Sequence, residues 1–254
     1  MSGGSEVRTW PDALHLYRAA ADEFTRAARQ AVAERGRFCV ALAGGTTPRG
    51  AYVLLAEDDA RQPPQRLPWE KIHLFFGDER HVPPGDPESN YRMVREALLD
   101  HIAIPEPNIH RMEGELPPQE AADAYQQLLR ESFALRPGEL PRFDLILLGM
   151  GPDGHTASLF PGSQALAETS RLVAANWIEK FHDFRLTLTF PVLNHAAEVL
   201  FLVSGASKAE MLRHVLEGEP AGAAYPAQRV RPDAGRLLWY ADHAAAALLA
   251  RSTR

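Results

Sequence analysis

The sequence predicts an α/β protein with a mostly parallel sheet covered by helices, and three observations lead to this prediction. Short apolar segments alternate with segments of helical spacing along the chain, which is the pattern of repeated strand–helix units. No Gly/Ser-rich linker, charge run or internal repeat divides the chain. Glycine and charged residues follow directly after several apolar segments, as at the carboxyl ends of strands in open α/β sheets. We therefore expect a single domain over residues 1–254.

The composition limits the classes of protein to which the chain can belong. Its 254 residues are 45% hydrophobic and 24% charged, which is ordinary for a globular protein with a sizeable core. The net charge of −6 gives no reason to expect a nucleic acid or an anionic membrane as a partner. Any phosphate group must therefore be bound by a local cluster of donors.

The N-terminal sequence and the single cysteine fit a cytoplasmic protein. The opening segment, MSGGSEVRTW, lacks the apolar stretch of a secretory signal, and no apolar run reaches membrane-spanning length. Cys39 has no partner for an intrachain disulfide, and a single cysteine excludes a cysteine-rich zinc site. We expect Cys39 to act as a small buried hydrophobic residue.

The first strand–loop–helix unit contains a candidate anion site. Residues 11–34 have helical spacing, and residues 38–43 are predicted to form a buried strand. A helix with Pro48 in its first turn is predicted to continue over residues 49–55. Between this strand and this helix lie Gly44, Gly45, Thr46 and Thr47. Such a turn can present backbone N–H groups to an anion, but an ordinary strand–helix turn fits these residues equally well.

The second unit ends in three consecutive charges. Residues 72–76 are predicted to form a strand, and Asp78, Glu79 and Arg80 follow it. Residues 82–89 contain three prolines and are expected to form a loop before a helix that ends near Leu99. The charges fit a solvated loop end or a weak ion pair, but their position after a buried strand favours a functional site.

The loop after residues 143–148 carries the main candidates for catalysis. The run is apolar at both odd and even positions, which predicts a strand buried on both faces of a parallel sheet. It stops at a glycine-rich segment that contains Asp153 and His155. Loops at this edge of a sheet concentrate functional residues, although Asp153 could instead cap a helix and His155 could lie on the surface.

The remaining elements complete the alternating pattern. Strands are predicted over residues 108–111, 172–174, 185–189, 199–203 and 236–240, and helices over residues 119–133, over residues 209–216, and after Asp242 in an Ala-rich segment. Lys208 lies where the helix over residues 209–216 begins. A lysine at a helix N-terminus opposes the helix dipole, which makes sense if an anion binds there; a solvated lysine is the other interpretation.

Four loops are expected to meet at one edge of the sheet. They follow the predicted strands that end at Ala43, Phe76, Leu148 and Val203. The carboxyl ends of parallel strands share one edge, so the glycine-rich turn, the three charges, the Asp–His segment and the lysine should lie together. This convergence is stronger evidence for a site than any single motif.

These loops resemble the 6-phosphogluconolactonase family. The matching segments are LAGGTTPRGAY (42–52), FFGDERHVPPGDPESNY (75–91), FDLILLGMGPDGHTASLFPG (143–162), RLTLT (185–189) and SGASKAEML (204–212). They occur in the family's order and spacing and span nearly the whole chain. The resemblance implies a Rossmann-like fold, similar to that of sugar-phosphate deaminases and isomerases, with helices on both faces of the sheet.

The resemblance implies hydrolysis of 6-phospho-D-glucono-1,5-lactone to 6-phospho-D-gluconate, the second step of the oxidative pentose phosphate pathway. His155 would be the general base, because an ordinary imidazole titrates near neutral pH, and Asp153 would orient the water or the imidazole. Arg80 would stabilise developing negative charge or hold substrate hydroxyls, with its geometry fixed by Asp78 and Glu79. The phosphate would be bound by Gly44, Gly45, Thr46, Thr47, Lys208 and Arg185.

The implied reaction needs no metal or organic cofactor, and no histidine-rich ligand spacing argues for one. The expected partner is a phosphorylated sugar lactone, with no nucleic acid and no membrane. We expect a monomer or a weak homo-oligomer.

Two alternatives from other classes are considered. Glucosamine-6-phosphate deaminases share the Gly-Gly-Thr turn and the Asp-Gly-His motif, but their pattern continues with an Asn-Glu pair, whereas residues 156–161 contain no carboxylate. A non-catalytic sugar-phosphate sensor would bind without turnover. That alternative is disfavoured because no helix-turn-helix segment or basic patch precedes the α/β region.

Overall fold

The structure is a computed structural model that describes residues 5–60, 66–218 and 225–250. Its centre is a seven-stranded sheet with the order β1-β10-β9-β6-β2-β3-β5, in which every neighbouring pair is parallel. The strands are β1 (Glu6–Trp10), β2 (Phe38–Leu42), β3 (Ile72–Phe76), β5 (Ile109–His110), β6 (Leu145–Gly149), β9 (Glu198–Val203) and β10 (Arg236–Asp242).

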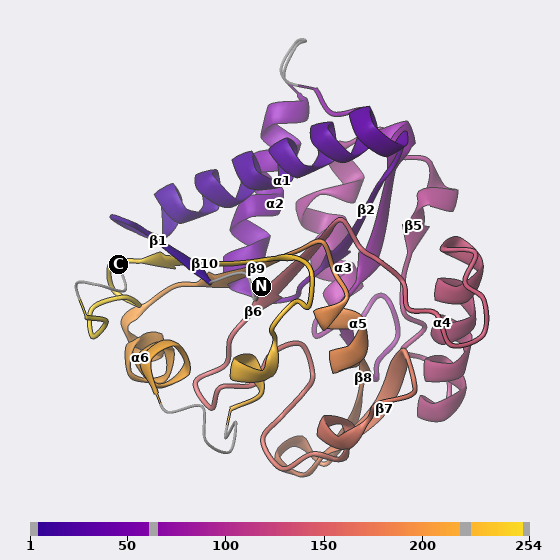
Figure 1. Ribbon diagram of the computed structural model, residues 1–254. Coiled ribbons are helices and arrows are strands. Elements are labelled where there is room, and N and C mark those ends of the chain that lie inside the picture. Colours follow the sequence, from indigo (N-terminus) through magenta and orange to yellow (C-terminus); the bar gives the residue numbers. More distant parts are fainter. Residues whose placement is uncertain (1–4, 61–65, 219–224, 251–254) are drawn as a thin grey trace.

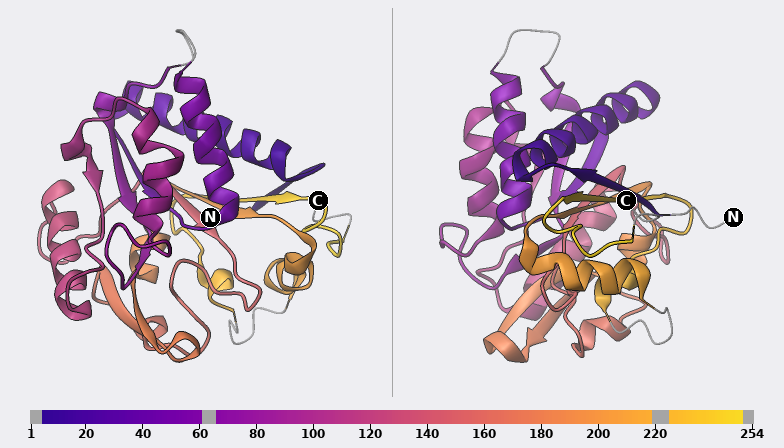
Figure 2. Two further views of the ribbon diagram at one scale, coloured as in Figure 1. Left: turned by 180° about the vertical axis from the view of Figure 1, so that it is seen from behind. Right: turned by 90° about the vertical axis from the view of Figure 1, so that its left-hand side faces the viewer.

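Helices cover both faces of this sheet, and the predicted α/β class is confirmed. In the right-hand view of Figure 2, α1 lies on one face and α6 on the other. The helices are α1 (Ala13–Arg35), α2 (Thr46–Asp59), α3 (Asn90–Ala97), α4 (Pro118–Ser132), α5 (Phe190–Asn194) and α6 (Ala209–Glu217). Short 3₁₀ turns span Trp69–Lys71, Leu99–His101, Glu106–Asn108, Gln164–Ala167, Glu179–Phe181, Ala206–Lys208 and Pro226–Arg229.

The sequence determines the bounds and packing of α1 in a direct way. Asp12 caps its N-terminus by accepting a hydrogen bond from the His15 backbone N–H at 3.0 Å. Gly36 ends it in a left-handed conformation with φ of 79°, and its N–H donates to the Val32 carbonyl. Phe24, on the inner face, meets Phe38 of β2 edge-to-face at 5.3 Å, which fixes the helix on the sheet.

A second, antiparallel sheet lies beside the main one. It consists of β4 (Asp78–Arg80), β8 (Asp183–Leu188) and β7 (Val173–Ile178), in that order. In Figure 1, β7 and β8 lie below the main sheet, and α4 packs along them. This small sheet matters for the site because only Gly77 separates β3 from β4, so β4 carries the three consecutive charges away from the main sheet.

The structure adds one strand and corrects two expectations. Residues 6–10, for which no element is predicted from the sequence, form the edge strand β1 beside β10, with Val7, Thr9 and Trp10 partly buried. Asp78, Glu79 and Arg80 form β4 rather than a loop, because β8 supplies partners for their backbone groups. The Ala-rich segment after Asp242 forms successive turns rather than a helix, although Asp242 does accept a hydrogen bond from the Ala245 N–H at 2.7 Å.

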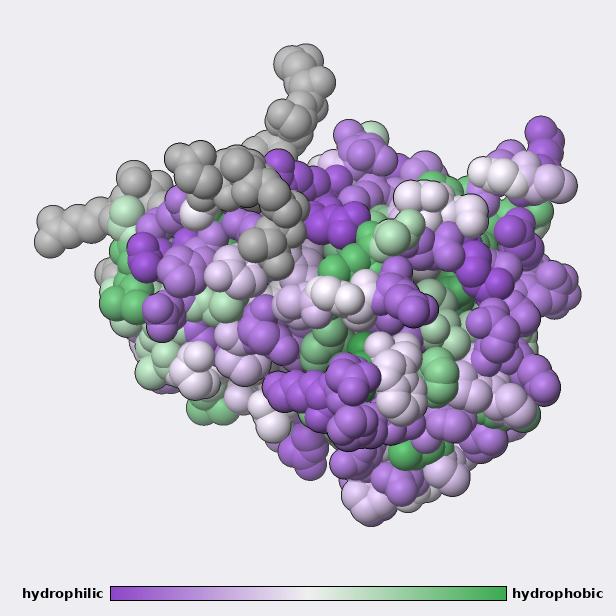
Figure 3. Space-filling model, turned by 90° about the horizontal axis from the view of Figure 1, so that it is seen from below, coloured by the Kyte–Doolittle hydropathy of each residue, from purple (hydrophilic) through white to green (hydrophobic). Residues whose placement is uncertain are grey.

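The surface seen from below mixes hydrophilic and hydrophobic residues over the whole view, without one large apolar area (Figure 3). The described helices include none that combines the length and apolar character needed to cross a lipid bilayer.

Candidate active site

The loops that follow β2, β3, β6 and β9 line one pocket of about 230 Å³, so the predicted convergence is confirmed. These four strands are consecutive neighbours in the sheet. The chain runs outward from β2 through β3 to β5, then returns to the other side of β2 with β6. The pocket therefore lies at the point where the strand order reverses, which is where open α/β sheets bind ligands. Predicted residues that line it are Gly44, Gly45, Thr46, Thr47, Asp78, Arg80, His155 and Lys208.

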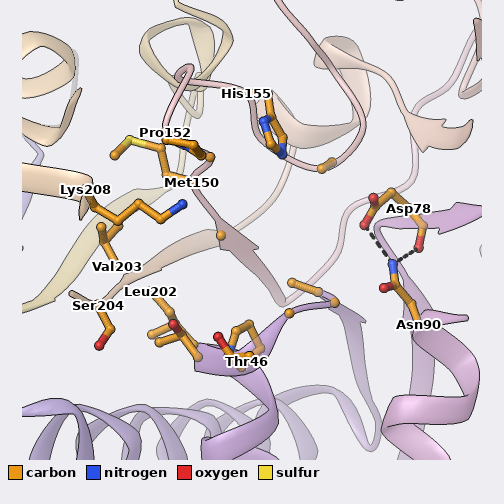
Figure 4. A pocket seen from close by; sticks show the side chains of 18 of the residues that line it. Thr46, Asp78, Asn90, Met150, Pro152, His155, Leu202, Val203, Ser204 and Lys208 are labelled. Atoms are coloured by element: carbon orange, nitrogen blue, oxygen red, sulfur yellow. Dashed lines mark hydrogen bonds between the residues drawn. The ribbon is translucent and has the colours of Figure 1, made fainter. Parts of the chain in front are cut away.

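His155 is held by a carboxylate and by an aromatic ring. Its Nδ1 lies 2.5 Å from Oδ1 of Asp153, and its ring stacks on Phe160 with 4.0 Å between ring centroids. A carboxylate accepts hydrogen bonds, so Nδ1 carries the proton and Nε2 is the ring nitrogen left to accept one. Figure 4 shows the imidazole directed into the pocket. The contact between Asp153 and His155, which the sequence left open, is thus present.

The loop backbone must approach this pair closely. A Cβ on Gly151 would lie 2.1 Å from Nδ1 of His155 and 2.6 Å from Oδ1 of Asp153, so only glycine leaves room for the pair. Burial opposes ionisation of Asp153, but its hydrogen bonds and charge interaction with His155 outweigh burial and lower its pKa to about 2. Asp153 therefore stays a carboxylate throughout the neutral pH range.

The N-terminus of α2 forms the opposite end of the pocket. Its N-cap residue is Gly45, and no side chain caps the first N–H groups of the helix. The chain between β2 and this turn is fixed at Ala43, because the hydroxyl of buried Tyr52 bonds both the N–H and the carbonyl of Ala43 at 3.0 and 2.9 Å. A rigid helix N-terminus with uncapped N–H groups favours an anion at this position.

Lys208 supplies a cation on the β9 side of the pocket. It is the N-cap of α6 and is half-buried. Across the described residues its ammonium makes no hydrogen bond or ion pair, and Figure 4 shows it reaching into the pocket opposite Asp78. Burial lowers the pKa of Lys208, and the charge of Asp153 partly opposes that shift. An anion in the pocket would give this ammonium its partner.

Two arginines lie side by side on the small sheet. Arg80 of β4 and Arg185 of β8 are direct cross-strand neighbours. The Arg80 guanidinium donates to the Glu88 carbonyl and lines the pocket. Arg185 is 8% exposed and does not line the pocket; it packs over the Phe181 ring at 5.1 Å, and its Nη1 has no hydrogen-bond partner in the described part of the chain. Burial, and then repulsion by Arg80, lower the Arg185 pKa.

Asp78 and Glu79 point in different directions, and neither fixes the Arg80 guanidinium as the sequence predicts. Asp78 lines the pocket and accepts a hydrogen bond from Ser158 Oγ at 2.7 Å. Glu79 points instead at the start of α3, where its carboxylate accepts from the N–H groups of Asn90 and Tyr91 at 2.7 and 2.8 Å. Burial raises the Glu79 pKa, and these backbone hydrogen bonds oppose the shift. Neither carboxylate accepts a hydrogen bond from the Arg80 guanidinium. The contact with Arg80 is instead the bond that its backbone N–H donates to the Glu79 carboxylate.

Two polar residues that sequence reasoning missed contact Asp78 at the same side of the pocket. Asn90 lines the pocket and donates from Nδ2 to the Asp78 carbonyl at 3.0 Å and to its carboxylate at 3.2 Å. Ser158, 2% exposed, bonds Asp78 from the His155 loop. No sequence signal indicates that Asn90 and Ser158 share Asp78 as a partner. In the described residues, no group of three or more His, Cys, Asp or Glu side chains is arranged to hold a metal ion.

The fold and the site define an α/β protein with an anion-binding, acid–base pocket at the carboxyl edge of its sheet. The family model described as glucosamine-6-phosphate isomerases/6-phosphogluconolactonase matches residues 11–239. The chain belongs to this family.

Individual relatives agree with this assignment. The 6-phosphogluconolactonase of Synechocystis sp. is 46% identical over 85% of this chain and 86% of its own. The 6-phosphogluconolactonase of Nostoc sp. is 41% identical over 96% of this chain and 98% of its own. The crystal structure of 6-phosphogluconolactonase from Thermotoga maritima has a TM-score of 0.79 and 31% identity, covering 94% of this chain and all of the other.

Proposed function

We propose that the protein hydrolyses 6-phospho-D-glucono-1,5-lactone to 6-phospho-D-gluconate, the second step of the oxidative pentose phosphate pathway. One observation carries the proposal: the His155 imidazole, held by the Asp153 carboxylate, lines the same pocket as an anion-binding end. Relatives of high coverage that are named 6-phosphogluconolactonase support the same reaction. A lactone is an activated ester, so a water activator, charge stabilisation and a grip on the phosphate suffice for its hydrolysis.

In this proposal His155 is the general base. Nε2 removes a proton from a water molecule as the water oxygen attacks the lactone carbonyl, while Asp153 holds Nδ1–H and stabilises the imidazolium. The tetrahedral intermediate collapses by breaking the bond between the carbonyl carbon and the ring oxygen. The imidazolium then returns its proton to that oxygen, which becomes a hydroxyl group.

We assign phosphate binding to the N-terminus of α2, with Gly44, Gly45, Thr46 and Thr47, and to Lys208. The uncapped helix N-terminus supports this assignment, and so does an ammonium that has no partner among the described residues. Arg80 is proposed to stabilise negative charge in the pocket. Arg185, its buried cross-strand neighbour, is proposed to add positive potential rather than a direct contact, because it does not line the pocket. Asp78 is proposed to form part of the pocket wall that faces the substrate. Glu79 is proposed to hold this wall in place through its hydrogen bonds to the start of α3.

The decisive experiment is hydrolysis of freshly generated 6-phospho-D-glucono-1,5-lactone, followed against its spontaneous rate. We expect the protein to accelerate the loss of lactone with one 6-phosphogluconate formed per lactone. A rate equal to the spontaneous one would refute the proposed function.

Deamination of glucosamine 6-phosphate is not favoured. The segment after His155 supplies no carboxylate to the pocket; Thr156 donates to the Gly149 carbonyl at 2.9 Å, which is a contact within the loop. An assay with glucosamine 6-phosphate under the same conditions should therefore show no turnover.

A cytoplasmic location and a monomeric or weakly oligomeric state are part of the same proposal. The buried, unpaired Cys39 is compatible with the former. The latter, the oligomeric state, is open to direct measurement. Light scattering at working concentration tests it, and a stable higher oligomer would contradict it.

A further inference from the structure

The wall of the pocket formed by Asn90 and Asp78 has a fixed hydrogen-bonding polarity. Asn90 is 3% exposed, and its Nδ2 donates to both the carbonyl and the carboxylate of Asp78. The Asp78 carboxylate is held in turn by Ser158 Oγ at 2.7 Å. Figure 4 shows the Asn90 nitrogen directed at Asp78 through both bonds. A flipped amide would place Oδ1 against two acceptor oxygens, so this orientation is imposed by its surroundings.

Oδ1 of Asn90 consequently points away from Asp78, toward the glycine-rich turn. A Cβ on Gly44 would lie 1.9 Å from this oxygen, so the absence of a side chain at Gly44 is what makes room for it. Both residues line the pocket. Oδ1 accepts no hydrogen bond from any residue that the structure describes, whereas every other polar group of this asparagine side chain has a partner.

We infer that Asn90 is a specificity-determining residue whose Oδ1 accepts a hydrogen bond from a hydroxyl group of the substrate. This inference rests on the proposed function and adds to it the way in which the sugar part is recognised. The lactone carries hydroxyls at C2, C3 and C4, and each can donate. An acceptor that is buried and left unpaired is costly, so a substrate lacking the matching hydroxyl is penalised beyond the loss of one contact.

The test combines hydroxyl deletion in the substrate with deletion of the acceptor. We would measure kcat/KM of the wild type and of Asn90→Ala for the parent lactone and for its 2-deoxy, 3-deoxy and 4-deoxy forms. For the wild type, kcat/KM for one of the deoxy lactones should be at least about tenfold lower than for the parent. In Asn90→Ala, the same deletion should cost less than about threefold, because no acceptor remains to be left unpaired.

Ser158→Ala is the matched control. It removes the other hydrogen bond to the Asp78 carboxylate and leaves Oδ1 of Asn90 in place. A purely structural role of the Asn90–Ser158–Asp78 wall predicts equal discrimination in both variants. Our inference predicts that Ser158→Ala keeps the wild-type discrimination between parent and deoxy lactone, whatever its overall rate. If Asn90→Ala does not fold, Asn90→Ser replaces it, because the shorter serine side chain does not reach the position of Oδ1.

The inference and the proposed function fail in different ways. A wild type that does not accelerate hydrolysis of the parent lactone refutes the proposed function. An active wild type that treats all three deoxy lactones like the parent refutes only the role of Asn90, as does an Asn90→Ala protein that retains the full discrimination.

Discussion

At the scale of single residues, His155 has the clearest expected effect. Its ring is fixed by Asp153 and Phe160, so its removal should take away the base without disturbing the phosphate end of the pocket. We expect His155→Ala to lower kcat by at least ~10²-fold while 6-phosphogluconate still binds. Steady-state kinetics and calorimetric titration of the product measure the two effects. Normal turnover by a folded variant would remove His155 from the mechanism.

Lys208 should act on binding rather than on chemistry. Its ammonium is unpaired among the described residues and faces the pocket from the β9 side. A charge-assisted hydrogen bond to phosphate is worth ~1.5–3 kcal/mol, so Lys208→Ala should raise KM by about 10–100-fold with a smaller change in kcat. Lys71→Ala, at an exposed lysine outside the pocket, is the control and should leave KM unchanged. An unchanged KM in Lys208→Ala would exclude it from phosphate binding.

At the scale of elements, Glu79 joins β4 to the start of α3. It is 2% exposed and accepts from Ser89 Oγ and from the N–H groups of Asn90 and Tyr91. Glu79→Ala leaves these donors without their acceptor, at ~1–3 kcal/mol for each one that stays buried. We expect Tm to fall by about 5–10 °C.

Differential scanning calorimetry measures this effect, and Glu96→Ala is the matched control on the exposed side of α3. It should change Tm little, because surface substitutions usually do. Equal Tm values for the two variants would mean that Glu79 does not stabilise the start of α3.

Sequence reasoning identified the elements of the parallel sheet and missed those that depend on distant partners. The runs over residues 38–43 and 143–148 are apolar because helices cover both of their faces, and that signal is local. β4 has the sequence Asp-Glu-Arg and becomes a strand only through β8, far along the chain. The segment after Asp242 is too short to hold a helix by propensity, and turns suffice to bury Ala245, Ala246 and Leu249.

The same distinction applies to the site. The residue types and the strand ends on which they lie are visible in the sequence, so the pocket could be predicted from four loops. The difference in position between Asp78 and Glu79 could not, because it depends on the alternation of side chains along β4. The orientation of Asn90 depends on Asp78 and Gly44, which contribute no recognisable spacing.

At the scale of the whole molecule, the edge of the sheet makes its stability sensitive to acid. His110 of β5 stacks on Phe75 at 4.2 Å and meets His73 at 3.2 Å. Burial, and then the neighbouring His73, lower the His110 pKa to about 4, and burial, and then the charge of Arg37, lower that of His73. As pH falls, these two histidines bind protons in the unfolded chain at a higher pH than in the folded protein. Their contribution to the free energy of unfolding is therefore present above pH ~6.5 and is lost as pH falls toward 4.

We expect Tm of the wild type to fall more than that of His110→Phe between pH 6.5 and 4, by about 2–4 °C, since solvent screens these half-buried rings. Phenylalanine keeps the stacking partner of Phe75 and removes the titrating group. His243→Phe, at an exposed histidine, is the control and should follow the wild-type profile. Parallel profiles of wild type and His110→Phe would contradict the prediction.

The reversal of strand order has a consequence for how the molecule can be divided. Residues up to β5 contain the α2 turn and Arg80, whereas residues from β6 onward contain His155 and Lys208. The exposed residues 136–139 separate these two halves. Fragments 1–137 and 138–254 should each be inactive alone and regain lactone hydrolysis when co-expressed, as the β2–β6 and β1–β10 pairings re-form. Hydrolysis would then report that the two halves have associated; activity in either fragment alone would show that one half suffices.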